Sequence, residues 1–321
     1  MTDGYTIAVV GAGLVGDRLV SELRRRDFPI KELRVLARSA RRSTLAGEEF
    51  EVGVAEPEAF EGVDFAFFAG TEGEKGAAVQ LAQEAISRGA VVIDNGSDFR
   101  MDPDVPLVVP EVNADALEDH NGLIANANCS TITMLLPLSP LVDRFGARRV
   151  VVSTYQAVSG SGRGGVEALE DGREDVYPRP IAGNAIPMIG DVGDDGYTTE
   201  ETKMRRESRK ILGLPDLEVF ATAVRIPVHT SHSESVYVET EREATLAEVL
   251  ETLREAPGVQ LFEDPEDFPT PLEATGDPST FVGRVRVEGN VISFWCVSDN
   301  LLKGAATNAV QIAESLINVK V

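Results

Sequence analysis

Short apolar runs alternate with amphipathic stretches over about the first 125 residues. The apolar runs are typical of buried strands, and the stretches between them have helical spacing. In chain order these segments are 7–10, 14–23, 33–37, 65–69, 76–86 and 91–94. Because strands that alternate with helices form parallel βαβ units, this region predicts an α/β domain with a parallel sheet.

The pattern of apolar residues changes after residue 129, where the apolar runs become longer and rich in β-branched residues. They are 150–156, 217–228, 235–240, 284–287 and 291–297, and they predict a mixed or antiparallel sheet in a second, α+β domain. A polar, Gly- and Pro-rich stretch at 160–199 is either an ordered excursion that contributes to a site or an interface, or a solvated loop. Residues 304–317 have the spacing of a terminal helix.

Composition sets limits on partners and location. The 321 residues suggest two domains, and 53 acidic against 30 basic side chains give a net charge of -23. This charge argues against nucleic acid or an anionic membrane as a partner. No window approaches the ~18 apolar residues of a membrane span, and Met1 to Asp3 lead into the first apolar run without a signal-like segment. We therefore expect a cytoplasmic protein.

The acidity and the cysteine count have further consequences. Only six of the basic residues are lysines, which fits a halophilic, high-salt cytoplasm, although an acidic mesophile is the alternative. Two cysteines, Cys129 and Cys296, provide no disulfide framework, so each thiol is either structural or reactive. No metal site is predicted.

A glycine-rich turn follows the first strand and opens the first helix. In Gly11-Ala12-Gly13-Leu14-Val15-Gly16 the glycines permit a tight turn, and the helix N-terminal amides can hold a pyrophosphate. This context predicts a Rossmann-type dinucleotide site. The second strand ends in Arg38-Ser39-Ala40-Arg41-Arg42 rather than in an acidic residue, and guanidinium groups pair with a 2′-phosphate. We therefore expect NADP; the alternative is a helix start whose arginines face water.

Candidate chemistry begins at Cys129, which follows Asn128 and precedes an apolar run with helical spacing. A thiolate at a helix N-terminus is stabilised by the amide dipoles, although a buried structural thiol is equally compatible with the position. Cys296 lies among Phe294, Trp295 and Val297 and is expected in the core.

Other polar residues lie at turns and predicted helix starts. Gln156 ends a strand before the turn Ser159-Gly160, where a plain turn is the alternative to a cofactor contact. A histidine near pKa 6.5 can act as acid and base, but a loop histidine is commonly only exposed. The histidines are His229 and His232 between two strands and His120 in a surface loop. Arg100 and Arg225 are either anion clamps or ordinary ion pairs with the plentiful carboxylates. Glu200 and Lys203 share one face at a predicted helix start, a spacing typical of a surface pair.

Five sequence blocks together resemble aspartate-semialdehyde dehydrogenase, in the order of that family and over nearly the whole chain. The blocks are Asp94-Asn95-Gly96-Ser97 with Phe99-Arg100, Asn128-Cys129-Ser130-Thr131, Tyr155-Gln156-Ala157-Val158-Ser159-Gly160, Arg225-Ile226-Pro227-Val228 with Ser231-His232-Ser233-Glu234, and Asp299-Asn300-Leu301-Leu302-Lys303-Gly304. The resemblance implies a Rossmann domain over 1–127, with 304–321 packing back on it, and a catalytic and dimerisation domain over 128–303.

The resemblance also implies roles for the candidate residues. Cys129 is the acylated nucleophile, His232 the general acid/base and Gln156 an orienting group for the thioester. Asn128 and Arg225 belong to the substrate site, with Arg225 on the α-carboxylate. The other implied roles are Arg100 and Lys203 on the phosphate, Glu200 on the amine, and Ser159, Gly160 and Asn300 at the nicotinamide end of NADP.

The implied reaction is the NADP-dependent reductive dephosphorylation of L-4-aspartyl phosphate to L-aspartate 4-semialdehyde. It proceeds through a thioester and releases inorganic phosphate, and it feeds lysine, threonine, methionine and isoleucine biosynthesis. The family implies a homodimer or homotetramer. Two alternatives stay open: an N-acetyl-glutamyl-phosphate reductase with the same chemistry, and a non-catalytic NADP-binding redox sensor.

Overall fold

The computed structural model describes residues 4–70 and 73–318, so Met1 to Asp3, residues 71–72 and the last three residues of the predicted segment 304–321 lie outside the described residues. The chain divides into two compact units. Unit 1 comprises residues 1–127 and 305–321, and unit 2 comprises residues 128–304.

Unit 1 is built on an eight-stranded, mostly parallel sheet with the strand order β3-β4-β2-β1-β5-β6-β8-β7. Every pairing is parallel except that of β3 with β4, which is antiparallel. The strands are β1 (Tyr5–Val10), β2 (Ile30–Ala37), β3 (Arg41–Leu45), β4 (Glu48–Val54), β5 (Phe65–Phe68), β6 (Val91–Asp94), β7 (Leu107–Val108) and β8 (Leu123–Asn126).

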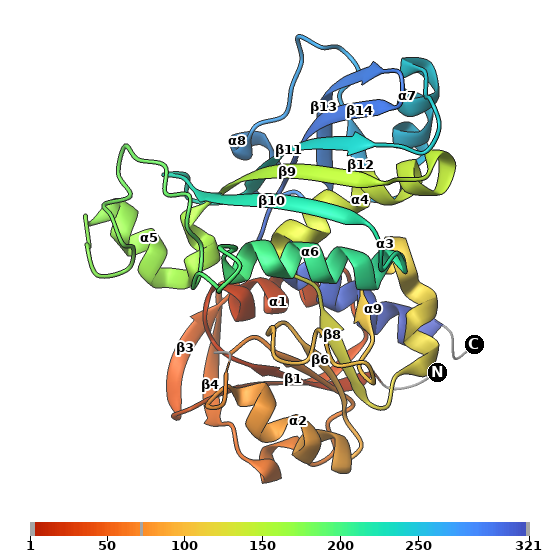
Figure 1. Ribbon diagram of the computed structural model, residues 1–321. Helices are drawn as coiled ribbons and strands as arrows, with labels where there is room; N and C mark the ends of the chain where they lie inside the picture. The colour runs from red at the N-terminus through yellow and green to blue at the C-terminus, as the bar shows by residue number, and fades with distance from the viewer. Residues whose placement is uncertain (1–3, 71–72, 319–321) are drawn as a thin grey trace. The chain divides into compact units, whose positions relative to one another are not determined.

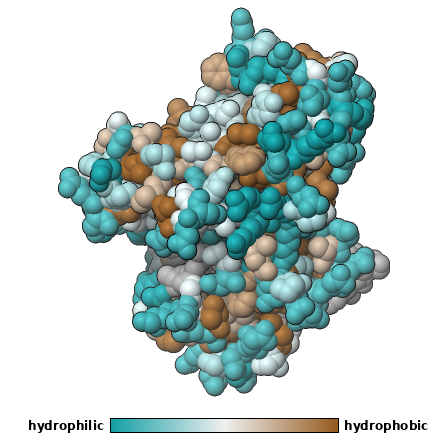
Figure 2. All heavy atoms as spheres, viewed as in Figure 1, coloured by the Kyte–Doolittle hydropathy of each residue, from teal (hydrophilic) through white to brown (hydrophobic). Residues whose placement is uncertain are grey.

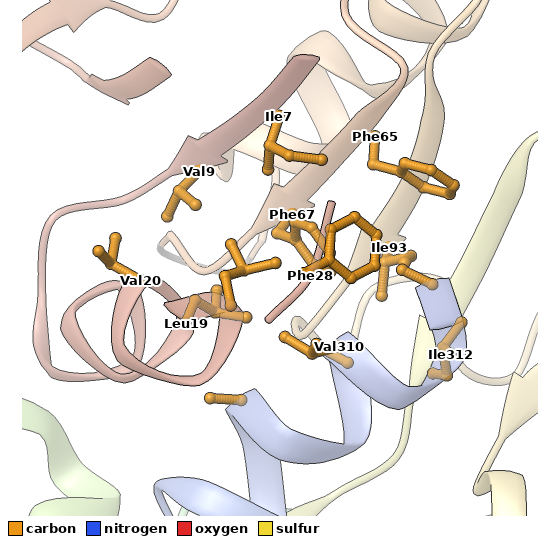
Figure 3. Close-up of a cluster of buried hydrophobic side chains, with 14 of the residues drawn as sticks. Ile7, Val9, Leu19, Val20, Phe28, Phe65, Phe67, Ile93, Val310 and Ile312 are labelled. Carbon is orange, nitrogen blue, oxygen red and sulfur yellow. The ribbon is translucent and has the colours of Figure 1, made fainter. Parts of the chain in front are cut away.

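Helices cover both faces of this sheet, with α1 (Leu14–Arg25) and α9 (Thr307–Asn318) on one face and α2 (Ala77–Ser87) on the other (Figure 1). Shorter helical segments are η1 (Pro57–Phe60), α3 (Pro110–Asn113) and η2 (Ala114–Asp119). Figure 3 shows Leu19 of α1 and Val310 of α9 in one buried cluster with Ile7 and Phe67 of the sheet. The C-terminal helix thus completes the core of the N-terminal domain.

Unit 2 contains a six-stranded mixed sheet in the order β10-β9-β11-β14-β13-β12. Parallel pairs at both edges, β10 with β9 and β12 with β13, flank antiparallel pairs in the centre. The strands are β9 (Arg149–Gln156), β10 (Glu218–Arg225), β11 (His232–Glu239), β12 (Val259–Leu261), β13 (Thr280–Glu288) and β14 (Val291–Ser298). The predicted fold class, a Rossmann-type parallel sheet followed by an α+β domain, is confirmed.

Several of the candidate residues lie on the helices of unit 2. They are α4 (Cys129–Phe145), η3 (Val158–Ser161), α5 (Gly162–Glu170), α6 (Thr199–Leu212), α7 (Leu246–Glu255) and α8 (Pro271–Ala274). A π-helical turn, η4 (Leu302–Ala306), leads out of the unit.

The stretch at 160–199 is ordered and has a small core of its own. Val158, Ala168, Ile181 and Ile186 form one buried cluster. The main chain of Ile186 exchanges two hydrogen bonds with Arg225, at 2.9 and 2.8 Å. Part of the excursion therefore packs on itself and supports the end of β10, while most of residues 171–197 are exposed and belong to no named helix or strand.

The surface is largely polar. On the face drawn in Figure 2, hydrophilic residues dominate and hydrophobic residues are exposed in small groups. Among the described residues, no helix combines the length and the hydropathy that a membrane crossing requires.

Candidate active site

Cys129 is the first residue of α4, as its position before an apolar run predicted. Asn128 is the N-cap, and its Oδ1 accepts the backbone N–H groups of Ser130 and Thr131 at 3.0 and 3.1 Å. Such a cap fixes the first helical turn. The thiol is half-buried and is in no disulfide, so it combines access with the positive end of the helix dipole.

Glu200 connects α6 to the start of α4 and to the end of β9. Its Oε1 accepts hydrogen bonds from Asn128 Nδ2 at 3.0 Å and from Gln156 Nε2 at 3.2 Å. Its Oε2 lies 3.8 Å from Lys203 Nζ, one turn along α6. Because Glu200 is buried and bound to two other candidate residues, the interpretation of Glu200 and Lys203 as a surface pair is wrong.

The turn after β9 fixes His232 and Arg225. The N–H of Ala157 donates a hydrogen bond to His232 Nδ1 at 3.0 Å, and the carbonyl of Ala157 accepts one from Arg225 Nη1 at 2.6 Å. Both side chains are buried. Arg225 ends β10, and His232 opens β11 rather than lying in an exposed loop.

The protonation state of His232 follows from this environment. Burial lowers the pKa of His232 well below its usual range, and the charge of Arg225 adds to the fall. Since Nδ1 accepts a hydrogen bond, the neutral ring carries its proton on Nε2. Nε2 therefore presents an N–H donor at neutral pH.

Asn300 joins the turn at Ser159 to the residue before His232. Its Oδ1 accepts from Ser159 Oγ at 3.1 Å and from the Ser231 N–H at 2.9 Å. A Cβ at Gly160 would lie 2.8 Å from Arg225 Nη1 and 3.2 Å from His232 Nε2. The turn thus lies against Arg225 and His232, and it has no room for a side chain at residue 160.

The absence of a side chain at Gly304 leaves room for Cys129. A Cβ at this position would lie 2.8 Å from Cys129 Cβ and 3.7 Å from Asn300 Cβ. Gly304 belongs to the π-helical turn η4, a kind of turn that is frequent at functional sites. Unit 2 therefore holds ten of the predicted site residues: Asn128, Cys129, Gln156, Ser159, Gly160, Glu200, Lys203, Arg225, His232 and Asn300.

The predicted nucleotide turn lies in unit 1. Gly11 has φ +120°, and a Cβ on Gly16 would lie 1.8 Å from the Gly11 carbonyl oxygen. The helix N-cap, Gly13, makes no side-chain cap, so the amides of Leu14, Val15 and Gly16 have no capping side chain. This geometry fits a pyrophosphate.

The arginines after β2 start a strand. Arg38, Ser39 and Arg41 are exposed, and Arg41 Nη1 donates to the Ser39 carbonyl at 3.3 Å. Arg42 is paired with Glu51 at 2.5 Å across β3 and β4. These arginines therefore precede and open a strand and not a helix, and their contact with a 2′-phosphate stays a prediction.

Arg100, also in unit 1, is buried and donates to two main-chain carbonyls, those of Asn126 at 2.9 Å and Asn95 at 2.8 Å. These bonds tie the segment after β6 to the end of β8. Its contact with a phosphate stays a prediction.

Comparison with known proteins covers both units. The sequence profile described as "Semialdehyde dehydrogenase, NAD binding domain" matches residues 6–120, and the one described as "Semialdehyde dehydrogenase, dimerisation domain" matches residues 138–303. The aspartate-semialdehyde dehydrogenase of Bacillus subtilis is 48% identical over 98% of each chain. The chain belongs to the aspartate-semialdehyde dehydrogenase family.

Other members of the family agree with this assignment. The enzyme of Aquifex aeolicus is 46% identical over 98% of each chain. A crystal structure of aspartate semialdehyde dehydrogenase II from Vibrio cholerae, complexed with ASA, superposes with a TM-score of 0.93 at 39% identity, covering 99% of both chains. The resemblance found in the five sequence blocks is confirmed, and a nicotinamide cofactor is supported.

The main-chain carbonyl of His229 accepts the Ser159 N–H at 3.1 Å, but the side chains of the remaining histidines and of the second cysteine make none of the contacts described above. His229 is exposed and lies 3.1 Å from Glu170. His120 Nδ1 accepts the N–H of Gly122 in a surface turn. Cys296 is fully buried in β14, as its apolar neighbours predicted.

Sequence reasoning missed two buried acids in this family member. Glu207 lies seven residues after Glu200 on α6, and Glu234 lies two residues after His232 on β11. Because of those spacings, each acid lies on the same face of its helix or strand as a candidate site residue. This was the feature of the sequence that could have revealed the two acids. Their burial could not be read from the sequence, because acidic residues are mostly exposed.

Glu234 is a fully buried acid on β11. Burial raises the pKa of Glu234 well above its usual range, and the nearby carboxylate of Glu200 adds to the rise. Cys296 Sγ, opposite it in β14, lies 4.0 Å from its Oε2. A hydrogen bond with the Ser130 side chain lowers the pKa of Glu234, by less than burial and Glu200 raise it.

Replacing Glu234 by glutamine is expected to change how stability depends on pH. Above about pH 4.5 the unfolded chain ionises at Glu234, while the folded chain keeps the proton until its own, higher pKa is reached, so over that window wild-type stability falls as pH rises, by up to about 1.4 kcal/mol per pH unit. Glu234→Gln removes this loss. Thermal unfolding of both proteins between pH 5 and 8 measures it: the Tm of the variant minus that of the wild type should rise with pH, and a constant difference would contradict a neutral Glu234.

Proposed function

We propose that the protein catalyses the NADP-dependent reductive dephosphorylation of L-4-aspartyl phosphate to L-aspartate 4-semialdehyde. The observation that carries this function is that unit 2 combines a cysteine at a helix N-terminus with a clamp for an amino acid. The clamp has a buried arginine, Arg225, and a buried carboxylate, Glu200. The full-length similarity to a relative crystallised with ASA supports the same substrate.

The clamp matches the charges of an α-amino acid. The Arg225 guanidinium can bind the α-carboxylate through two parallel hydrogen bonds. The Glu200 carboxylate, oriented by Asn128 and Gln156, can accept the ammonium group. Lys203, half-exposed beside Glu200, and Arg100 supply positive charge for the phosphate.

Catalysis starts with attack of the Cys129 thiolate on the acyl carbon. The carbon–sulfur bond forms as the carbon–oxygen bond to phosphate breaks, and phosphate leaves with the electron pair. His232 Nε2–H donates a hydrogen bond to the carbonyl oxygen as negative charge develops there, and Gln156 orients the resulting thioester. After reduction of the thioester, cleavage of the carbon–sulfur bond regenerates the thiolate and releases the aldehyde. His232 serves as the acid/base group in these steps.

NADP is the cofactor that the residues of unit 1 fit. The glycine turn and the N-terminus of α1 would hold the pyrophosphate, and Arg38, Ser39 and Arg41 would hold the 2′-phosphate. The bound reduced cofactor supplies a hydride to the thioester carbon. Ser159, Gly160 and Asn300 would face its nicotinamide end.

An assay of phosphate-dependent NADP reduction tests the function. Purified protein should turn over aspartate semialdehyde and leave the N-acetylated glutamate semialdehyde untouched, because Glu200 requires a free amine. Turnover of the acetylated substrate alone would overturn the proposal in favour of an N-acetyl-glutamyl-phosphate reductase. NADP binding without turnover of either substrate would favour a redox sensor. The substrate clamp argues against that outcome, because a sensor has no use for it.

We also propose that the protein forms a homodimer through unit 2, and that a tetramer forms when two dimers pair. Phe220, Val151 and Tyr237 lie directly opposite one another on β10, β9 and β11. All three are exposed, by 44%, 40% and 38%. A row of apolar side chains across an open sheet face is typical of a subunit interface, and sedimentation velocity measures the association.

The acidity of the chain fits a cytoplasm with high salt. A net charge of -23 repels anionic substrates, and molar salt limits that repulsion to about 3 Å. Activity and stability are therefore expected to rise with KCl concentration; highest activity in salt-free buffer would contradict a halophilic origin. A reactive thiolate also requires a reducing compartment, and the product would feed the biosynthesis of lysine, threonine, methionine and isoleucine.

A further inference from the structure

Asn128, the residue before the nucleophile, is held on two sides by one helix. Its Nδ2 donates to Glu200 Oε1 at 3.0 Å, and its backbone N–H donates to Glu207 Oε2 at 2.7 Å. Glu200 and Glu207 are two helical turns apart on α6 and are both buried. The same helix therefore holds the side chain and the main chain of the N-cap of α4.

The two contacts do different work. The bond to Glu200 joins Asn128 to the proposed substrate clamp. The bond to Glu207 is made by the main chain, one peptide unit from Cys129, and it is almost fully shielded from water, since Glu207 is 1% exposed. Because the Asn128 side chain also caps α4, a shift of its backbone would move the cap and the sulfur together.

We propose that Glu207 is a positioning residue for the reaction: by holding the main chain of Asn128, it sets the place of the Cys129 sulfur relative to the substrate clamp on the same helix. This inference rests on the proposed function for the identity of the reaction. A nucleophile displaced by about 1 Å can lose about 100-fold in rate. The loss falls mainly on kcat, because Glu200 keeps its hydrogen bond from Gln156 and Arg225 keeps its bond to the Ala157 carbonyl, so both still bind the substrate.

The test compares three variants of Glu207 in the full-length protein. Glu207→Ala should lower kcat about 10- to 100-fold and change the KM for aspartate semialdehyde by less than about threefold. Glu207→Gln keeps an oxygen that accepts the Asn128 N–H and should stay within about fivefold of wild type. Glu207→Asp, which keeps the charge but draws the oxygens back, should fall between them and serves if the alanine variant does not fold.

A matched control is Glu22→Ala in unit 1. Glu22 is also 1% exposed and accepts a hydrogen bond, from Thr307 Oγ1, at 2.7 Å. Its replacement should lower Tm and leave kcat unchanged. If Glu207→Ala or Glu207→Asp kept the wild-type kcat, or if either raised only KM, the positioning role would be overturned.

Hydrogen exchange separates this inference from the function itself. In a peptide spanning 126–131, the Asn128 amide should exchange about tenfold faster or more in Glu207→Ala than in wild type, and equally in Glu22→Ala and wild type. This readout needs no substrate. If wild-type protein fails to turn over aspartate semialdehyde, the proposed function fails while the exchange result still decides whether Glu207 holds Asn128; unchanged exchange overturns the inference.

Discussion

Replacing Cys129 by serine is expected to abolish turnover of aspartate semialdehyde while leaving NADP binding unchanged. A serine hydroxyl at the start of α4 stays protonated at neutral pH and is a weak nucleophile. Removal of an activated nucleophile costs about 10⁴-fold or more in rate. Steady-state kinetics and a titration that follows NADPH fluorescence measure the two quantities separately.

The second cysteine provides the matched control for this variant. Cys296 is fully buried in β14, so Cys296→Ser places a hydroxyl in the core and should lower Tm with little effect on kcat. Wild-type turnover by Cys129→Ser would refute the thioester mechanism. Loss of NADP binding in that variant would mean that the thiol supports the fold of the cofactor site, which its place in unit 2 does not predict.

Local signals predicted the parts of this protein that depend on short stretches of sequence. The glycine turn after β1 and the helix that begins at Cys129 each follow from residues within one turn of the chain, and both lie where the sequence placed them. The strand at Arg41 was missed, because a run of arginines carries no alternation of apolar and polar residues.

Burial and long-range contacts decided the rest of the site. The spacing of Glu200 and Lys203 is typical of an exposed helix pair, and only the hydrogen bonds from Asn128 and Gln156, 72 and 44 residues away, connect Glu200 to the other candidate residues. His232 is a second example. Its sequence position suggested an exposed loop, but its side chain is buried at the start of a strand, where the Ala157 N–H donates to it. The resemblance supplied these roles because a family pattern contains tertiary information that periodicity lacks.

Arg225→Lys is expected to raise the KM for aspartate semialdehyde about 10- to 100-fold, with a smaller effect on kcat. The lysine keeps the positive charge but cannot form two parallel hydrogen bonds to a carboxylate, and a lost charge-assisted bond costs about 1.5–3 kcal/mol. It also loses the 2.6 Å bond from Nη1 to the Ala157 carbonyl, on the residue whose N–H holds His232.

The same substitution at the other end of the strand pair is the control. Arg149 opens β9 opposite Glu218 of β10, just as Arg225 ends β10 opposite Gln156. Arg149 is exposed and ion-paired, so Arg149→Lys should leave both kinetic constants unchanged, since surface pairs contribute little. If Arg225→Lys matched Arg149→Lys in KM and kcat, Arg225 would not bind the substrate carboxylate, and the clamp would have to be rebuilt around Lys203 and Arg100.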